Sequence, residues 1–377
     1  MQKFFNIFPD YEKSHKSYVH DTLTGSEFFD TVSMFSSLPL GYNHKIFDDS
    51  FKKKVVSICA HKVSNTIFKS NIEEEFINKL LETTTLKNIH ICATGSLAVE
   101  AAIKSALVAH DGKRKEILSL KNGFHGIYSW GTLTDYKASF AKKRLEFMPR
   151  LTWPRLDIEQ VETYLLDNPN LAGIILELVQ CTAGDIYLPI KILKTIRKIC
   201  KENNICFIVD EIQTGMGTTG NYWYSVQKEL NPDIIIFGKK CQVSGILSSD
   251  VYSFAINSKN RYLNVTFDGD LIDLLRANYI MSAIKQYNLL DNITLASSKI
   301  KSALFPLFEN YRSQGSLICF DFKSKKIRDI FVSMAYKHFL LVNPTGEKSL
   351  RMRLHLAIDE LEIEDLISKI KSSIKEI

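Results

Sequence analysis

Short apolar runs that end abruptly in charged residues mark the middle of this chain. One run, Ile205 to Val209, ends at the carboxylate of Asp210, and another, Ile234 to Phe237, ends at Gly238 and a lysine pair. Short uninterrupted apolar runs bounded by polar residues are typical of strands that are buried on both faces of a parallel sheet. The pattern therefore predicts two such strands, with charged side chains at or just after the end of each.

Further strands and helices alternate around these two runs. Apolar residues recur at helical spacing over 72–81, 97–107 and 191–201. Between them, strands are expected at 90–93, 117–120 and 173–178. Strands that alternate with helices are typical of a mainly parallel α/β sheet with helices on its faces.

The pattern changes after about residue 270. There the chain is expected to form helices over 271–287 and 294–311, short strands at 316–322, 339–342 and 351–356, and a final amphipathic helix over 360–377. The first fifty residues are aromatic-rich and irregular. The length of 377 residues exceeds that of one typical domain. We therefore predict a large α/β domain over 56–275, and a smaller α+β lobe built from 276–377 together with the N-terminal segment 1–55.

Composition and charge exclude several classes of function. A hydrophobic content of 45% and a charged content of 24% are those of an ordinary soluble globular protein. No apolar run is long enough to span a bilayer, so no membrane partner is expected. The net charge of +6 comes from short, scattered basic runs without interleaved aromatics, which argues against a nucleic-acid partner. Seven cysteines without CxxC spacing fit a reducing compartment, so a cytoplasmic location is expected.

The acid and the amines at the two strand ends indicate a cofactor. In open α/β sheets, chemistry collects at the carboxyl ends of strands. Pyridoxal phosphate (PLP) needs a lysine for its Schiff base and an acid facing its pyridinium nitrogen. Asp210 suits the second role, Lys239 or Lys240 the first, and Gln213 is close enough in sequence to reach the ring oxygen. The alternative is a helix-capping acid beside solvated lysines, although a lysine after a buried run can be desolvated and made nucleophilic.

Two other segments could complete a PLP site. Gly95 and Ser96 lie between a predicted strand and a predicted helix, where backbone N–H groups and the helix dipole favour a phosphate. The alternative is that Ser96 only caps the helix. Phe124 lies between glycines just after another strand, so its ring could stack on a flat cofactor. The alternative is a core aromatic in an ordinary turn.

Assembled in order, these motifs resemble those of the class III (fold-type I) PLP-dependent aminotransferases, and within them the lysine 6-transaminase branch. The segments that carry the resemblance are TGSLAVEAAIK (94–104), LKNGFHG (120–126), ILELVQCTAGD (175–185), IVDEIQTGMGTTG (208–220), NPDIIIFGKKCQVSG (231–245) and LNVTFDGDLIDLLRA (263–277). The combination of DEIQTG with PDIIIFGKK is the most specific of these matches.

The resemblance implies the reaction and a role for each matched residue. An amine donor would pass its amino group to the cofactor, and a keto acid such as 2-oxoglutarate would then take it in a ping-pong mechanism. The family also implies a homodimer with shared sites. The roles carried over are phosphate binding for Gly95 and Ser96, ring stacking for Phe124, pairing with the pyridinium for Asp210 and with the ring oxygen for Gln213, the Schiff base for Lys239, and binding of the partner subunit's phosphate for Thr266.

Departures from the family pattern bear on the substrate. The arginine that follows the FHG motif is Ile127 here, and the second acid of the strand-end motif is Thr182, while Glu177 keeps the first acid and is a candidate for substrate binding. The Arg-x-x-Pro-Pro signature lacks its prolines, although Arg351 and Arg353 could bind the carboxylate of the acceptor. A surface ion pair on the last strand is the alternative for these two arginines.

Because an arginine is missing on the donor side, we hypothesise a lysine-like or modified, less acidic amine as donor. Two other functions stay open at this point. The same scaffold could run a racemase, mutase or decarboxylase reaction, or the chain could be a degenerate relative that binds PLP without turnover.

Overall fold

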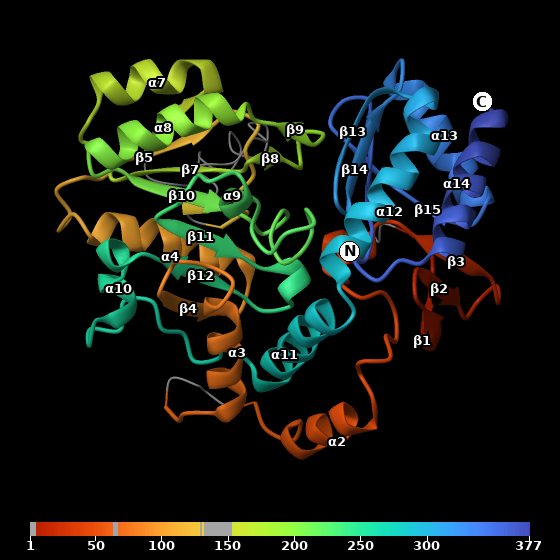
Figure 1. The fold of residues 1–377 in the computed structure, drawn as a ribbon, viewed down its shortest axis with the longest axis horizontal. Helices are drawn as coiled ribbons and strands as arrows, with labels where there is room; N and C mark the ends of the chain where they lie inside the picture. The colour runs from red at the N-terminus through yellow and green to blue at the C-terminus, as the bar shows by residue number, and fades with distance from the viewer. Residues whose placement is uncertain (1–4, 63–66, 129, 132–152) are drawn as a thin grey trace. The chain divides into compact units, whose positions relative to one another are not determined.

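The structure is a computed structural model that describes residues 5–62, 67–128, 130–131 and 153–377 (Figure 1). The chain divides into two compact units. The first, here called the sheet unit, comprises 58–216 and 223–278. The second, here called the terminal unit, comprises 1–57, 217–222 and 279–377.

The sheet unit is built on a seven-stranded sheet. In spatial order its strands are β4 (Asn88–Cys92), β12 (Ser244–Ser248), β11 (Ile234–Phe237), β10 (Cys206–Asp210), β7 (Gly173–Leu176), β5 (Ile117–Leu120) and β6 (Arg155–Leu156). Only β12 pairs antiparallel with its neighbours; the other pairs run parallel. The predicted mainly parallel α/β architecture is therefore confirmed.

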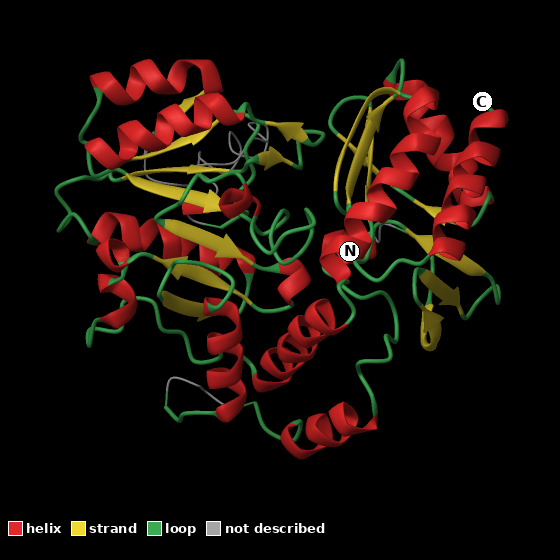
Figure 2. Ribbon diagram, in the orientation of Figure 1, coloured by secondary structure: helices red, strands yellow, loops and turns green. Residues whose placement is uncertain are grey.

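Helices cover both faces of this sheet, as Figure 2 shows. Successive residues of a strand point to opposite faces, and the two faces have separate cores. Ile208 and Ile234 pack with α4 (Gly95–Val108) on one face, whereas Phe207 and Val209 pack with the helices of the other face. Those helices are α7 (Ile158–Asp167) and α8 (Ile190–Glu202). Among the residues that the structure describes, the other helices of eight residues or more in this unit are α3 (Asn71–Leu81) and the first half of α11 (Leu271–Gln286).

The terminal unit combines residues from both ends of the chain. One of its sheets has the order β1 (Pro9–His15), β2 (Tyr18–Asp21), β3 (Glu27–Asp30) and β15 (Leu340–Leu341). The other has the order β13 (Glu309–Gln314), β14 (Leu317–Asp321), β17 (Ser349–Arg353) and β16 (Asn343–Thr345). Its longer helices are α2 (Asp49–Ile58), α12 (Leu289–Leu304), α13 (Lys325–Lys337) and α14 (Glu360–Lys375).

Two secondary-structure expectations were wrong, and several elements, such as α7 and α13, were not foreseen. The first fifty residues are not irregular but contain the strands β1, β2 and β3. The helix expected over 294–311 ends at Leu304, because a 3₁₀ turn with Pro306 follows it and residues 309–311 belong to β13. The antiparallel strand β12 was not foreseen at all. None of the described helices combines the length and the apolar character that crossing a membrane requires.

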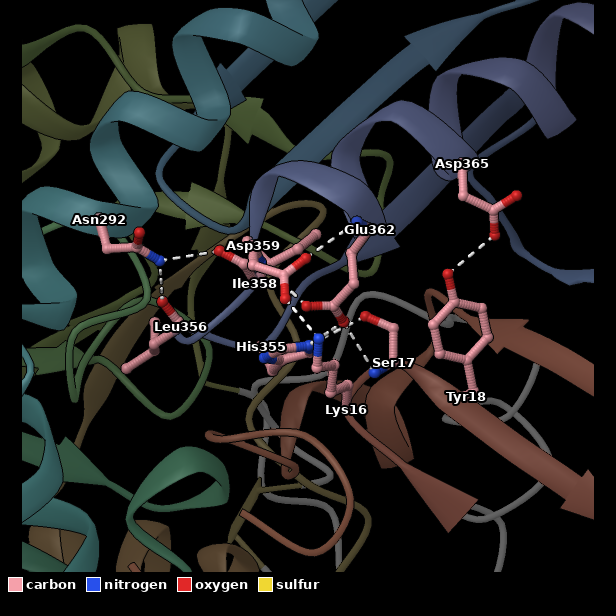
Figure 3. Close-up of polar contacts among 10 residues, drawn as sticks. All are labelled: Lys16, Ser17, Tyr18, Asn292, His355, Leu356, Ile358, Asp359, Glu362 and Asp365. Carbon is pink, nitrogen blue, oxygen red and sulfur yellow. Dashed lines mark hydrogen bonds and ion pairs between the residues drawn. The ribbon is translucent and has the colours of Figure 1, made fainter. Parts of the chain in front are cut away.

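A buried polar network in the terminal unit joins the N-terminal strands to the start of α14 (Figure 3). His355 Nε2 lies 2.9 Å from Ser17 Oγ and 2.9 Å from Glu362 Oε1. The same Glu362 oxygen accepts a 2.9 Å bond from the backbone N–H of Ser17. Asp359 caps α14 and pairs with Lys16. All three residues of the His355–Ser17–Glu362 cluster are buried.

Glu362 should make this unit sensitive to acid. Burial alone would raise the pKa of Glu362, but the hydrogen bond and charge of His355, with the N–H of Asp359, lower it from 4.5 to about 2. Because the folded-state pKa is below the unfolded one, ionised Glu362 stabilises the fold above 4.5, and this contribution is lost as the pH falls towards 2. Glu362→Gln is expected to cost about 3 kcal/mol of unfolding free energy at neutral pH.

Urea unfolding of the wild type and of Glu362→Gln at a series of pH values checks this expectation. Glu364→Gln serves as the control, because Glu364 is an exposed glutamate on the same helix. The gap between wild type and Glu362→Gln should narrow between pH 4.5 and 2. An equal gap at every pH would show that the charge of Glu362 is not what stabilises the unit.

Candidate functional site

The candidate residues of the sheet unit gather at one edge of its sheet. Asp210 is the last residue of β10, Glu177 follows β7, and Lys239 comes two residues after β11. The segments 94–96 and 121–126 follow β4 and β5. All five strands run in the same direction, so these segments meet at the carboxyl ends of the sheet, where α/β proteins bind ligands.

Asp210 is paired with a histidine that the sequence reasoning missed. Asp210 Oδ2 lies 2.9 Å from His125 Nδ1, and both side chains are buried. Asp210 Oδ1 accepts a 3.1 Å bond from the backbone N–H of Ile212. An ionised carboxylate only accepts, so His125 donates through Nδ1. The position of His125 between glycines was a signal, but nothing local indicated which acid it would meet.

Lys239 has an unusual backbone conformation. Its φ is 46°, in the left-handed region that costs a non-glycine residue energy, although other residues of this chain, such as Lys16 and Asn43, share that region. The Lys239 side chain is partly exposed, whereas the neighbouring Lys240 is buried. Lys239 also lies close enough to the Glu177 carboxyl for its positive charge to act on the pKa of that group.

Glu177 is a buried acid beside Asp210. Burial is the main cause that raises the pKa of Glu177 well above its usual value, and the charge of Asp210 adds to it. The backbone N–H of Phe124, which donates a 3.3 Å hydrogen bond to Glu177 Oε1, and the charge of Lys239 oppose this rise without cancelling it. Burial and the charge of Asp210 therefore favour the protonated form of Glu177 over the ionised form.

The segment at the start of α4 has the features of an anion site. Thr94, not Ser96, caps the helix, because Thr94 Oγ1 accepts the N–H of Leu97 at 3.4 Å. Gly95 and Ser96 are the first residues of the helix, where backbone N–H groups lack partners within the helix. The 121–126 loop packs directly on them: a Cβ at Gly126, whose φ is +98°, would lie 2.9 Å from Ser96 Oγ.

Phe124 and Gln213 are both partly exposed at this edge. Gln213 has a buried atom, Oε1, without a hydrogen-bond partner, and an unpartnered buried acceptor is costly unless a ligand satisfies it. PLP requires an acid with a fixed orientation, an amine, an amide with a free acceptor, an aromatic ring and a helix N-terminus. This edge of the sheet offers each of these groups. The residues present therefore fit this cofactor.

Asp268 joins the loop of Thr266 to the segment before α4. Its Oδ1 accepts the N–H of Ala93 at 3.0 Å, and its Oδ2 accepts the N–H of Val265 at 2.9 Å. Thr266 itself is exposed, whereas Asp268 is buried. Asp268 thus fixes the distance between two segments, and the resemblance implies that each of them contacts a cofactor phosphate.

Replacing Asp268 by alanine is expected to weaken cofactor binding about tenfold, because two backbone N–H groups lose their acceptor and both loops gain freedom. Titration of the purified protein with PLP measures the change. Asp167→Ala, which alters an exposed carboxylate at the end of α7, is the control. An unchanged affinity of Asp268→Ala for PLP would show that the two hydrogen bonds of Asp268 do not contribute to cofactor binding.

The two candidate arginines lie in the terminal unit. Arg353 is buried, and its Nη1 donates a 3.0 Å hydrogen bond to the carbonyl oxygen of Met352. Arg351 is partly exposed and faces the side-chain amide of Asn343, whose oxygen accepts from Nε and Nη2 of Arg351 in the amide orientation that satisfies both residues. Their contact with a substrate stays a prediction. In the sheet unit, Ile127 is exposed and Thr182 is partly exposed.

A family model for aminotransferase class-III matches residues 2–374. The chain belongs to the class III aminotransferases. The resemblance predicted from the motifs is thereby confirmed, and the chain is a PLP-dependent transaminase of fold-type I architecture.

Individual relatives of this class III aminotransferase cover nearly its whole length. The L-lysine-epsilon aminotransferase of Streptomyces clavuligerus is 26% identical, with 98% of this chain and 91% of the relative aligned. The 4-aminobutyrate aminotransferase of Dictyostelium discoideum is 25% identical, with 99% and 86% aligned. A solved structure of lysine aminotransferase from M. tuberculosis, in its internal aldimine form, has a TM-score of 0.92 and 25% identity, and covers 100% of this chain and 96% of that one.

Proposed function

We propose that this aminotransferase moves an amino group from the terminal amine of a lysine-like or modified amine to a keto acid such as 2-oxoglutarate. The observation that carries the proposal is the meeting of Lys239, Asp210 and its partner His125 at the strand ends. The names of the relatives support the donor class, because the ε-amine of lysine and the amine of 4-aminobutyrate are both terminal amines.

PLP, when bound, supplies an aldehyde that bonds to amines and a ring that accepts electrons from the amine-bearing carbon. Gly95 and Ser96 would bind its phosphate through N–H groups at the start of α4, and Phe124 would stack on its ring. Gln213 would bind the ring oxygen. Asp210, oriented by His125, would hold a proton on the ring nitrogen.

Lys239 would carry out the covalent chemistry. Its amine is the group that would hold the cofactor covalently while no substrate is bound. When free, the same amine would be the base that takes the proton from the amine-bearing carbon of the substrate and delivers it to the cofactor. The charge of Lys239 acts on the Glu177 carboxyl, whose pKa burial raises well above its usual value.

Two replacements in the motifs bear on the donor. Ile127 places an exposed apolar side chain where the lysine 6-transaminase pattern has an arginine, and Thr182 replaces an acid. These replacements support a modified or less acidic donor. Arg351 and Arg353 are the candidates for the carboxylate of the acceptor.

We further propose a homodimer in which Thr266 binds the phosphate of the partner subunit. Its neighbours Val265 and Phe267 are also exposed, and a loop that presents two large apolar side chains is suited to contact another chain. A cytoplasmic location is supported by the cysteines, since all seven lie within the described residues and none forms a disulfide bond.

An absorbance titration tests the proposed function. Purified protein with PLP is titrated with L-lysine, 4-aminobutyrate and a panel of other terminal amines, and then with 2-oxoglutarate. The visible band of the lysine-bound cofactor should bleach with one donor and return with the keto acid. L-lysine as the best donor would contradict the modified-amine part, and a band that no amine bleaches would contradict amino transfer.

A further inference from the structure

The loop over 121–126, which carries Phe124, has no regular secondary structure of its own. Two buried side chains from the segment after β7 hold it. Gln180 Nε2 donates a 2.7 Å hydrogen bond to the carbonyl oxygen of Lys121, and Glu177 Oε1 accepts the 3.3 Å bond from the N–H of Phe124. The segment 177–180 therefore holds this loop by hydrogen bonds at two positions, Lys121 and Phe124.

The third tie of the loop comes from the next strand in the sheet. His125 pairs with Asp210 at the end of β10, and β10 lies beside β7. The ring of Phe124 and the imidazole of His125 thus depend for their positions on groups from two adjacent strands. Without these ties, a loop that contains two glycines would have considerable backbone freedom.

The raised pKa of Glu177 is compatible with this use. Burial of its carboxyl is the main cause, and the charge of Asp210 adds to it. A protonated carboxyl still accepts a hydrogen bond from an N–H group.

We propose that Glu177 and Gln180 are positioning residues that fix the 121–126 loop through these two hydrogen bonds, and that Glu177 is not a contact to the substrate. This role differs from the substrate contact that the resemblance implies for Glu177. The proposal rests on the proposed function only for the identity of the group that Phe124 and His125 face. The hydrogen bonds that hold the loop do not depend on that function, because both partners of each bond are residues of this chain.

Paired variants of Glu177 separate the two roles. Glu177→Gln keeps a neutral acceptor of nearly the same shape, so its kcat/KM is expected within about threefold of wild type, with an unchanged pH profile. Glu177→Leu removes the acceptor, and kcat should fall by about 10- to 100-fold with little change in KM. Glu162→Gln, on an exposed part of α7, is the matched carboxyl-to-amide control.

Two measurements that need no catalytic activity test Glu177 and its contacts with the loop directly. Hydrogen exchange followed by mass spectrometry, on protein with and without PLP, should show faster exchange over 121–126 in Glu177→Leu and in Gln180→Met, but not in Glu177→Gln. The infrared difference spectrum of wild type minus Glu177→Gln should contain the carbonyl band of a neutral carboxylic acid at neutral pH.

The outcomes distinguish this inference from the proposed function. If Glu177→Gln loses as much activity as Glu177→Leu, the positioning role is wrong although amino transfer stands. An ionised carboxylate in the difference spectrum would contradict the raised pKa of Glu177. If wild type transfers no amino group, the proposed function fails, and the exchange results still decide whether Glu177 holds the loop. Equal exchange rates in wild type and Glu177→Leu would overturn the inference.

Discussion

Lys239→Ala is expected to abolish amino transfer, with kcat lower by at least about 10⁴-fold. The variant loses both the amine that bonds the cofactor aldehyde and the base that moves the proton. Gly95, Ser96 and Phe124 remain in place, so it should still bind PLP without the covalent bond. The absorbance spectrum should accordingly show free aldehyde in place of the visible band, and single-turnover kinetics with an amine measure the rate.

Lys240→Met decides between the two adjacent lysines. Lys240 is buried, and methionine fills a similar volume without the charge. If Lys239 forms the covalent bond, Lys240→Met should keep the visible band and most of the activity that its stability permits. An unchanged band in Lys239→Ala, together with its loss in Lys240→Met, would move the assignment to Lys240.

The parts of the fold that the sequence predicted are those with a strong local pattern. Strands β10 and β11 are continuous apolar runs because every side chain in them is buried, and such a run can be recognised without its neighbours. In β1, by contrast, most side chains are exposed, so no alternation marks it as a strand. Its place is set by pairing with β2, and the pairing of β3 with β15 joins segments from opposite ends of the chain.

The candidate site also combines features that a local sequence pattern predicts with features that only long-range pairing sets. The positions of Asp210 and Lys239 at strand ends were predictable, because each lies at or just after the end of a recognisable strand and such a position is local information. The pairing of His125 with Asp210 spans 85 residues, and that of Phe124 with Glu177 spans 53. Both depend on the strand order β10–β7–β5, which brings the three loops together and which no local pattern contains.

Asp210→Asn is expected to lower kcat by about 10³-fold, a loss comparable to removing a preorganised electrostatic contact from the transition state. The amide cannot hold a proton on the ring nitrogen, so the ring accepts electrons poorly from the amine-bearing carbon. The asparagine oxygen can still accept from the N–H of Ile212, and its NH2 group can donate to Nδ1 of His125 in the other tautomer of the ring, so the fold should persist. Steady-state kinetics and cofactor titration measure the two effects separately.

A cofactor methylated on its ring nitrogen gives the sharpest test of this role. Such a ring carries its positive charge permanently, so the charge no longer depends on the acid at position 210. Asp210→Asn loaded with methylated PLP should therefore recover much of the lost rate, whereas wild type should gain nothing. If methylation fails to restore Asp210→Asn while the variant still binds the cofactor, the acid acts in some other way than by protonating the ring. The same experiment on Lys239→Ala should give no recovery, because a charged ring cannot replace the missing base.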